Sequence, residues 1–175
     1  FSIGTYLWTK NNTITNSRVS ESILGIMLSG SNTTIINNYL VENQQGLFFG
    51  FNGVNETIPS DIVVHHNSFV HNSVQINGCF CEDYPEDETP HSWDDGKQGN
   101  YWSDYNGTDA DSDGIGDTPY IIDQMNLDRY PLMASSEQQL SQIFAPAFDP
   151  VIIALSLGIL CCVTIFMLWL FRRAK

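Results

Sequence analysis

Three glycines spaced 21 residues apart constrain the fold of this chain more than any other feature. They are Gly4, Gly25 and Gly46, and the sequence between them repeats with the same spacing, so that residues 11–14 (NNTI) align with residues 32–35 (NTTI). A fixed period in the range of roughly 20 to 50 residues indicates stacked structural units, each of which packs on its neighbours. The chain is therefore expected to build its core by stacking repeats.

The segments within each repeat have the composition of short β-strands, because β-branched and aromatic residues are separated by Asn, Ser and Gly. At about 3.3 Å per residue, one repeat spans roughly 70 Å, which is enough for three short strands and three corners. A third copy begins at Asp61, 29 residues after Asn32, so this repeat carries eight additional residues. We predict an all-β parallel β-helix, or solenoid, over residues 1–78, with the additional residues forming a surface loop.

The alignment also predicts which side chains stack on one another. Asn38 should lie on Asn67 and Asn43 on Asn72, where corner amides can form hydrogen-bonded ladders. We expect these asparagines to shape the corners rather than to bind a ligand. Apolar residues at equivalent positions should form inward-facing columns, namely Ile14, Ile35 and Val64; Val19, Leu40 and Phe69; and Tyr6, Met27 and Phe48.

The rest of the chain divides by composition. Residues 79–131 contain an acidic loop and then an aromatic, glycine-rich segment, which is expected to cap the exposed end of the stack. Residues 132–150 are expected to form a stalk. At the other end, Phe1 aligns with Ser22, which lies inside a repeat, so we expect the stack to be truncated at its N-terminus.

An uncharged apolar run covers residues 151–171, about 31 Å as a helix, which matches the hydrocarbon core of a bilayer. The basic tail at 172–175 follows directly. This order predicts a single-pass transmembrane helix in the cell membrane, with the C-terminus cytoplasmic and the N-terminal bulk extracellular. That bulk would hold all 20 Asp and Glu residues but few basic ones, which excludes nucleic acid as a partner.

The strongest chemical motif is a run of alternating acids. Asp109, Asp111, Asp113 and Asp117 occupy positions 1, 3, 5 and 9 of an EF-type loop, and Ile115 can offer its carbonyl at position 7. Hard oxygen donors in this pattern favour Ca²⁺ over a transition metal. Position 12 departs from the pattern, because Tyr120 stands where a bidentate Glu is usual. Water, Asp104 or Asp123 would have to complete the ligation, and the alternative is an acidic turn without metal.

The histidines and cysteines give a weaker signal. A copper or zinc site would have to use His65, His66, His71 and His91, with Cys79 or Cys81 as a further candidate ligand. Neighbouring residues in a strand point to opposite faces, so we expect at most one of His65 and His66 to join His71. Without a C-x-x-C or H-x-x-x-H spacing, copper is not expected. Cys79 and Cys81 are expected to form a disulfide, to each other or to a partner upstream.

A hydrolytic site was also considered. Glu21, Glu42 and His71 align in one column of the stack, and two carboxyl groups about 5 Å apart would suit a retaining glycosidase. Their neighbours are ordinary corner residues, so these three remain weak catalytic candidates and no catalytic residue is assigned.

The segments Trp93–Tyr105 (WDDGKQGNYWSDY) and Asp109–Tyr120 (DADSDGIGDTPY), together with the Asn-rich repeats, resemble the C-terminal part of NosD-like β-helix surface proteins. This group is often labelled periplasmic copper-binding and belongs to the carbohydrate-binding and sugar-hydrolase β-helix class. The acidic, anchored form is similar to archaeal cell-surface proteins. The resemblance implies a right-handed β-helix and an exported location. It implies little about activity, because the copper label reflects association with the assembly of a copper enzyme.

Two functions from different classes follow as expectations. The preferred one is a non-catalytic surface module, stabilised by calcium, that binds a glycan or a surface protein or builds the cell envelope. The alternative is a polysaccharide-modifying enzyme, of glycoside hydrolase or lyase type, whose catalytic coils lie mainly upstream of Phe1.

Overall fold

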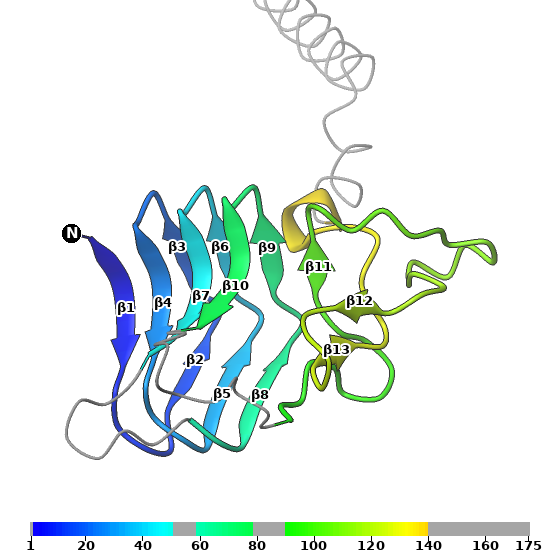
Figure 1. Ribbon diagram of the computed structural model, residues 1–175. Coiled ribbons are helices and arrows are strands. Elements are labelled where there is room, and N and C mark those ends of the chain that lie inside the picture. The colour runs from blue at the N-terminus through cyan, green and yellow to red at the C-terminus, as the bar shows by residue number, and fades with distance from the viewer. Residues whose placement is uncertain (1, 51–58, 79–89, 140–175) are drawn as a thin grey trace, which may run out of the picture. The chain divides into compact units, whose positions relative to one another are not determined.

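The computed structural model describes residues 2–50, 59–78 and 90–139. The chain divides into two compact units, Phe1–Ser136 and Glu137–Lys175, and the description below concerns the first. Its dominant feature is three parallel sheets, to each of which every repeat contributes one strand (Figure 1).

The three sheets are built from strands of two to five residues. The first contains β1 (Ile3–Leu7), β4 (Leu24–Leu28), β7 (Gln45–Phe49) and β10 (Val74–Gly78). The second contains β2 (Thr13–Thr15), β5 (Thr33–Ile36) and β8 (Ile62–His65). The third contains β3 (Arg18–Ser20), β6 (Tyr39–Val41), β9 (Ser68–Val70) and β11 (Tyr101–Trp102). A separate antiparallel pair joins β12 (Tyr120–Ile121) to β13 (Leu127–Asp128).

The strand register confirms the predicted repeat. Ile14 pairs with Ile35, and Ile35 pairs with Val64, so the spacing is 21 residues and then 29. The column of Val19, Leu40 and Phe69 is also confirmed, and its last two side chains are fully buried. The two predicted asparagine stacks are present as well.

One predicted column is wrong. Tyr6, Met27 and Phe48 are paired in register, but they do not face the core, and Tyr6 is 44% exposed. The inward side chains of these strands are one residue away, at Ile26 and Leu47, which are fully buried. Successive residues in a strand point to opposite faces, so an error of one position exchanges the whole inward set for the outward one.

The corners between strands share an unusual backbone conformation. Each repeat places three non-glycine residues in the left-handed region, five residues apart, and equivalent corners carry the same conformation in successive repeats. They are Asn11, Asn16 and Glu21; Asn32, Asn37 and Glu42; and Asp61, His66 and His71. This conformation costs roughly 1–2 kcal/mol per residue, least for Asn and Asp, so stacking in the neighbouring repeats must hold it in place.

A buried polar ladder runs through one corner into the C-terminal part. Asn38 donates its backbone N–H and its side-chain amide to Oδ1 of Asn67, at 2.9 and 3.0 Å. Asn67 donates in the same way to Oδ1 of Asn100, both bonds at 3.0 Å. Asn100 in turn donates its backbone N–H to the carboxylate of Asp128 at 2.6 Å. All four residues are at most 1% exposed.

Asp128 ends this ladder because a carboxylate accepts hydrogen bonds without needing to donate one. Oδ2 of Asp128 also accepts the indole N–H of Trp102 at 2.9 Å, and its Oδ1 accepts the backbone N–H of Tyr130 at 3.1 Å. Burial raises the pKa of Asp128, and these hydrogen bonds act in the opposite direction. Gly99 allows the close approach, since a Cβ there would overlap the Asp128 carboxylate.

Residues 90–136, which we call the cap, cover the end of the sheets at β8 and β9. Trp93 and Trp102 are 2% and 1% exposed, so both side chains belong to the apolar interior under the cap. Trp102 stacks on Phe69 with a centroid distance of 4.5 Å and on Tyr120 at 4.3 Å, so the apolar column continues into the cap. Two residues of the predicted stalk also contact this part of the molecule. Leu132 forms a β-bridge with Tyr101, and the hydroxyl of Ser136 lies within hydrogen-bond distance of the hydroxyl of Ser68.

The predicted fold class needs correction. The structure establishes parallel sheets with a repeating register and almost no helix, since the helical residues of the described ranges are limited to the single turn at 136–139. It does not establish the closed right-handed solenoid that we predicted. The period determines which residues pair, but it does not determine how the sheets close around the core.

The predicted membrane anchor is also corrected. Within the described ranges, no helix has the length and apolar character needed to cross a bilayer, and residues 151–171 lie outside those ranges. The transmembrane helix, the single-pass topology, the cell-membrane localisation and the membrane as a partner are therefore withdrawn. Hydropathy measures the preference of a segment for an apolar environment, and it does not say whether that environment is a bilayer.

The ladder makes a direct prediction about stability. Asn100→Ala removes the acceptor of two Asn67 donors and leaves the carbonyls of Val64 and Trp93 without their amide donor. We expect the free energy of unfolding to fall by about 3 kcal/mol or more, because buried polar groups lose their partners. Chemical denaturation of the full chain measures the change.

Asn106→Ala is the matched control, because it deletes the same amide from an exposed position of the cap. This variant should unfold within about 0.5 kcal/mol of the parent. Equal losses in the two variants would show that the ladder does not carry the stability assigned to it.

Candidate functional site

The acidic loop at 109–117 is shaped by hydrogen bonds from its own backbone. The carboxylate of Asp109 accepts the N–H groups of Asp113 at 3.1 Å and Gly114 at 3.0 Å. Asp113 accepts the N–H of Ile115 at 2.8 Å. Ser112 and Gly114 have positive φ angles of 61° and 86°, which turn the chain sharply between the acids. The loop therefore curls its carboxylates toward a common centre.

Three of the four predicted acidic ligands meet at that centre. Carboxylate oxygens of Asp109, Asp111 and Asp113 lie within 4.8 Å of one another. Asp109 is half-buried, while Asp111 and Asp113 are exposed. Three hard oxygen donors at this separation are suited to a cation such as Ca²⁺.

The remaining predicted ligands lie elsewhere. Asp117 Oδ2 accepts the hydroxyl of Thr108 at 2.9 Å and the N–H of Ala110 at 3.0 Å, so this carboxylate closes the base of the loop. Ile115 lies in a bridge to Leu132, and its carbonyl remains a predicted ligand.

Neither proposed replacement for the missing position-12 ligand is in the group. Asp104 bonds to Tyr120, and Asp123 bonds to Asn126.

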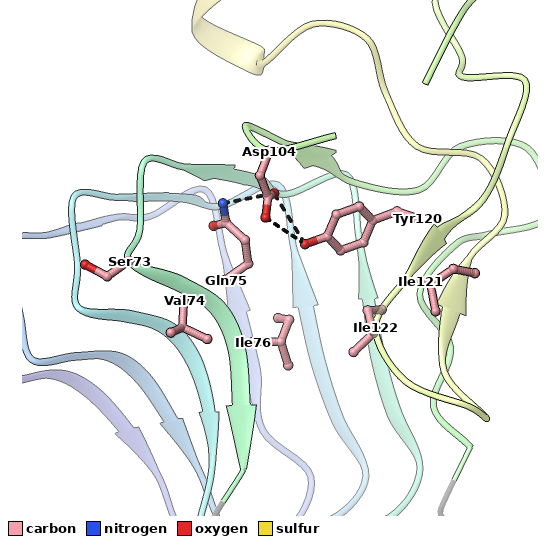
Figure 2. Close-up of a pocket in the computed structure, with 8 residues that line it drawn as sticks. All are labelled: Ser73, Val74, Gln75, Ile76, Asp104, Tyr120, Ile121 and Ile122. Carbon is pink, nitrogen blue, oxygen red and sulfur yellow. Dashed lines mark hydrogen bonds between the residues drawn. The ribbon is translucent and has the colours of Figure 1, made fainter. Parts of the chain in front are cut away.

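A pocket with a volume of about 240 Å³ lies between β10 and the cap (Figure 2). Val74, Ile76, Ile121 and Ile122 provide its apolar wall. Its polar groups bond to one another, since Gln75 Nε2 donates to Asp104 Oδ1 at 3.2 Å and the Tyr120 hydroxyl donates to Asp104 Oδ2 at 3.2 Å. The pocket is smaller than most ligand sites, and its hydrogen-bonding groups are already engaged.

The chemistry available in this pocket is limited. Burial and the negative charge of Asp104 raise the pKa of Tyr120 well above its ordinary value, so Tyr120 stays protonated and acts as a donor. Asp104 is the sole carboxylate among the lining residues. A general acid paired with a base or nucleophile, as glycoside hydrolysis requires, is not found in this lining.

The weak catalytic candidates lie together at one corner, as the alignment predicts. Glu21, Glu42 and His71 all have left-handed backbone, with φ of 55°, 55° and 51°, and all three side chains are exposed. Their common position is explained by the corner, because each directly follows a strand of the third sheet.

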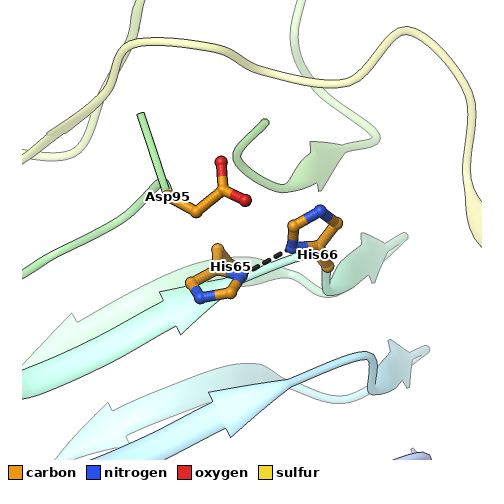
Figure 3. Close-up of side chains that lie close together, drawn as sticks. All are labelled: His65, His66 and Asp95. Carbon is orange, nitrogen blue, oxygen red and sulfur yellow. Dashed lines mark hydrogen bonds between the residues drawn. The ribbon is translucent and has the colours of Figure 1, made fainter. Parts of the chain in front are cut away.

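The structure brings together a group that our sequence analysis had separated. His65, the last residue of β8, and His66, the following corner residue, have ring centroids 4.8 Å apart, and their Nδ1 atoms are 2.5 Å apart (Figure 3). Atoms of His65, His66 and Asp95 lie within 4.8 Å of one another. The prediction that the two histidines face opposite ways is wrong. His66 has φ of 57°, so the alternation of a strand does not extend to it.

Asp95 is held in position by a tight turn. Its Oδ1 accepts the backbone N–H groups of Gln98 at 2.8 Å and Lys97 at 2.9 Å, and these bonds lower the pKa of Asp95. Burial, and then the neighbouring imidazole of His66, lower the pKa of His65 and favour its neutral imidazole.

Among the described residues, the other histidines considered for a copper or zinc site are outside this group. His91 stacks on Phe49 with a centroid distance of 5.1 Å, and Cys79 and Cys81 lie outside the described residues.

An ion pair secures the turn that carries Asp95. Arg129 Nε donates to Asp94 Oδ2 at 2.9 Å and Arg129 Nη2 donates to Asp94 Oδ1 at 2.6 Å, and Gly96 N–H also donates to Asp94. Burial by itself raises the pKa of Asp94, but the hydrogen bonds from Arg129 and Gly96 outweigh it, so the pKa lies below its ordinary value.

Arg129→Met should lower the free energy of unfolding at neutral pH, because the Asp94 carboxylate, whose side chain is 3% exposed, loses its cation. The depressed pKa of Asp94 means that the contribution of the pair is present above the unfolded pKa of 3.8 and is lost as the pH falls through the folded value. The difference between parent and variant should therefore shrink below about pH 4.

Urea unfolding at a series of pH values measures this difference. Lys97→Met, which removes an exposed cation from the same turn, is the control and should leave the profile unchanged. A constant difference down to about pH 2 would contradict the assigned role of the ion pair.

Comparison with known proteins adds no assignment. No family model matches the sequence, and a search of the curated proteins found no match. The resemblance to NosD-like proteins therefore remains a prediction, and the functional argument has to come from the residues themselves.

Proposed function

We propose that this chain is a non-catalytic binding or structural module whose cap is stabilised by Ca²⁺ held at Asp109, Asp111 and Asp113. The observation that carries the proposal is the convergence of these three carboxylates on one side of a short loop. Calcium prefers carboxylate, carbonyl and water oxygens, and the exposure of Asp111 and Asp113 leaves room for water ligands.

Electrostatics favour a cation at this position. Two carboxylates about 5 Å apart repel each other by roughly 1 kcal/mol even in water, and three such pairs are present in the group. Backbone N–H groups offset part of this repulsion, since they donate to Asp109 and Asp113. A divalent ion would offset the rest and would order the loop in its observed curl.

Backbone bonds on both sides connect the acidic loop to the rest of the cap. Gly116 N–H donates to the carbonyl of Pro131 at 2.8 Å, and Met133 N–H donates to the carbonyl of Gly114 at 3.0 Å. Leu132, between them, donates its N–H to the carbonyl of Asn100 at 2.8 Å. Asn100 belongs to the buried ladder, so order in the acidic loop supports the segment that holds the cap on the sheets.

The alternative, a polysaccharide-modifying enzyme, is not favoured by the described residues. Its candidates Glu21 and Glu42 are exposed corner residues, and the pocket lined by Asp104 and Tyr120 holds one carboxylate and a protonated phenol.

Calcium should stabilise the full chain measurably. Binding to the folded state at a free calcium concentration 100-fold above the dissociation constant contributes ~2.7 kcal/mol. Chelator should therefore lower the melting temperature and speed amide exchange in residues 90–136 before it does so in the sheets. Scanning calorimetry and hydrogen exchange measure the two effects.

Asp111→Asn with Asp113→Asn should abolish the response to calcium, since both changes remove ligand charge from the group. Glu21→Gln with Glu42→Gln removes the same charge from an exposed corner and should keep the full response. If the Asp double variant responds to calcium and chelator like the parent, the loop is an acidic turn and calcium is not held there.

A further inference from the structure

We propose that His65, His66 and Asp95 form a second metal site, which takes a divalent transition-metal ion of the Zn²⁺ class. The site lies where the second sheet meets the cap and is separate from the acidic loop. Its donor set is two imidazole nitrogens and one carboxylate oxygen, all within 4.8 Å of one another. Zn²⁺ binds this combination of ligands and keeps a fourth position for water when the protein supplies three.

The donors distinguish this site from the proposed calcium site. Imidazole suits zinc and other first-row transition ions, whereas Ca²⁺ and Mg²⁺ prefer oxygen ligands alone. His65, His66 and Asp95 would offer a calcium ion one carboxylate, while the acidic loop offers three. The two groups should therefore select different ions.

His66 is oriented for ligation by a second hydrogen bond. Its Nε2 lies 3.0 Å from Gln98 Oε1, and with that oxygen as acceptor the ring hydrogen is on Nε2. The lone pair is then on Nδ1, which faces His65 and Asp95 (Figure 3). A metal-binding histidine is commonly fixed in this way, because the outer hydrogen bond sets the tautomer and the ring direction.

The backbone also holds the group together. His66 N–H donates to the carbonyl of Gly99 at 2.6 Å, which ties the corner to the turn that contains Asp95 and Gln98. The Asp94–Arg129 ion pair secures the other end of that turn. All three ligands therefore project from segments that are fixed before a metal arrives.

Metal entry requires a small movement of the rings. Two tetrahedral ligands at about 2.0–2.1 Å from Zn²⁺ are roughly 3.3 Å apart, while the two Nδ1 atoms are 2.5 Å apart in the structure. Side-chain rotation must separate them by a little under about 1 Å, and the hydrogen that His65 Nδ1 donates to His66 Nδ1 must move, through solvent, to His65 Nε2. Both Nδ1 lone pairs are then available for metal–nitrogen bonds.

The repeat itself supplies variants that preserve the fold. The register pairs His65 with Ile36, and the corner occupied by His66 is occupied by Asn37 in the preceding repeat. His65→Ile and His66→Asn therefore copy residues that the chain already uses at those places. The matched control is His71→Glu. It introduces the residue, Glu42, that the preceding repeat has at the equivalent corner, and it removes a histidine that is outside the site.

Isothermal titration of the full chain with ZnCl₂, in excess calcium to occupy the acidic loop, tests the proposal. We expect one zinc site per chain whose affinity falls at least about 100-fold in His65→Ile and in His66→Asn. Asp95→Asn keeps an oxygen acceptor for the turn and should weaken binding about 10-fold. His71→Glu should bind zinc like the parent. These values follow the usual loss when one ligand or its support is removed.

X-ray absorption of the zinc-loaded parent identifies the ligands. Nitrogen and oxygen at about 2.0–2.1 Å with imidazole scattering would support the site, whereas sulfur at about 2.3 Å would show that cysteine thiolates hold the ion and would overturn the proposal. The proposal is also overturned if the parent binds no zinc, or if the His65 and His66 variants bind it like the parent.

Discussion

The structure depends on a one-directional ladder of buried hydrogen bonds that runs from Asn38 through Asn67 and Asn100 to Asp128. The amide oxygens of Asn67 and Asn100 each accept two bonds from the preceding asparagine, so every step needs an acceptor in the next layer. If another repeat with an asparagine followed, that asparagine would again need an acceptor in the layer after it. Asp128 ends the ladder, because a carboxylate accepts from Asn100, Trp102 and Tyr130 and has no donor of its own when ionised. The cost of burying that charge is offset by these bonds, and the cap is consequently joined to the sheets by polar bonds as well as by apolar packing.

The corners have a second consequence, which concerns the surface rather than the core. Stacking forces three residues of every repeat into left-handed backbone, whatever their side chains are. Among residues other than glycine, asparagine and aspartate adopt this conformation most readily. A histidine or a glutamate at such a corner is therefore not explained by the backbone conformation, and its side chain is available for binding. At Asp61, His66 and His71 the last repeat departs from asparagine and glutamate, and one of these residues, His66, lies against the cap. The proposed zinc site arises from that contact between a corner and the cap.

The candidate binding groups of the described residues are found in the cap and on the part of the repeats that it contacts. The cap contributes the acidic loop, the turn with Asp95 and the Asp104–Tyr120 pair, while the repeats contribute His65, His66 and Gln75. A cap must cover apolar side chains and backbone groups at the end of a sheet, and it does so here with aromatic stacking on Phe69. In the function that we propose, the acidic residues of the cap would make that cover sensitive to cations. Metal binding would then increase the stability of the stacked repeats, and this is what we mean by a calcium-stabilised module.

The sequence alone determined the repeat, the pairing register and much of the core. A 21-residue period with eight additional residues predicts that Ile14, Ile35 and Val64 pair and that Asn38 lies on Asn67, because equivalent positions in stacked repeats must meet. It also located the carboxylates of Asp109, Asp111 and Asp113, since their spacing is set within one short loop. Tertiary structure decided the rest. Which face of β1, β4 and β7 is buried depends on a shift of one residue that the period does not specify. The contact of His65 and His66 with Asp95 depends on the left-handed backbone of His66 and on a turn 29 residues further along the chain. The acceptor role of Asp128 depends on its burial beside Asn100 and Trp102. Contacts between the repeats and the cap are fixed by packing in three dimensions, and the 21-residue period carries no information about them.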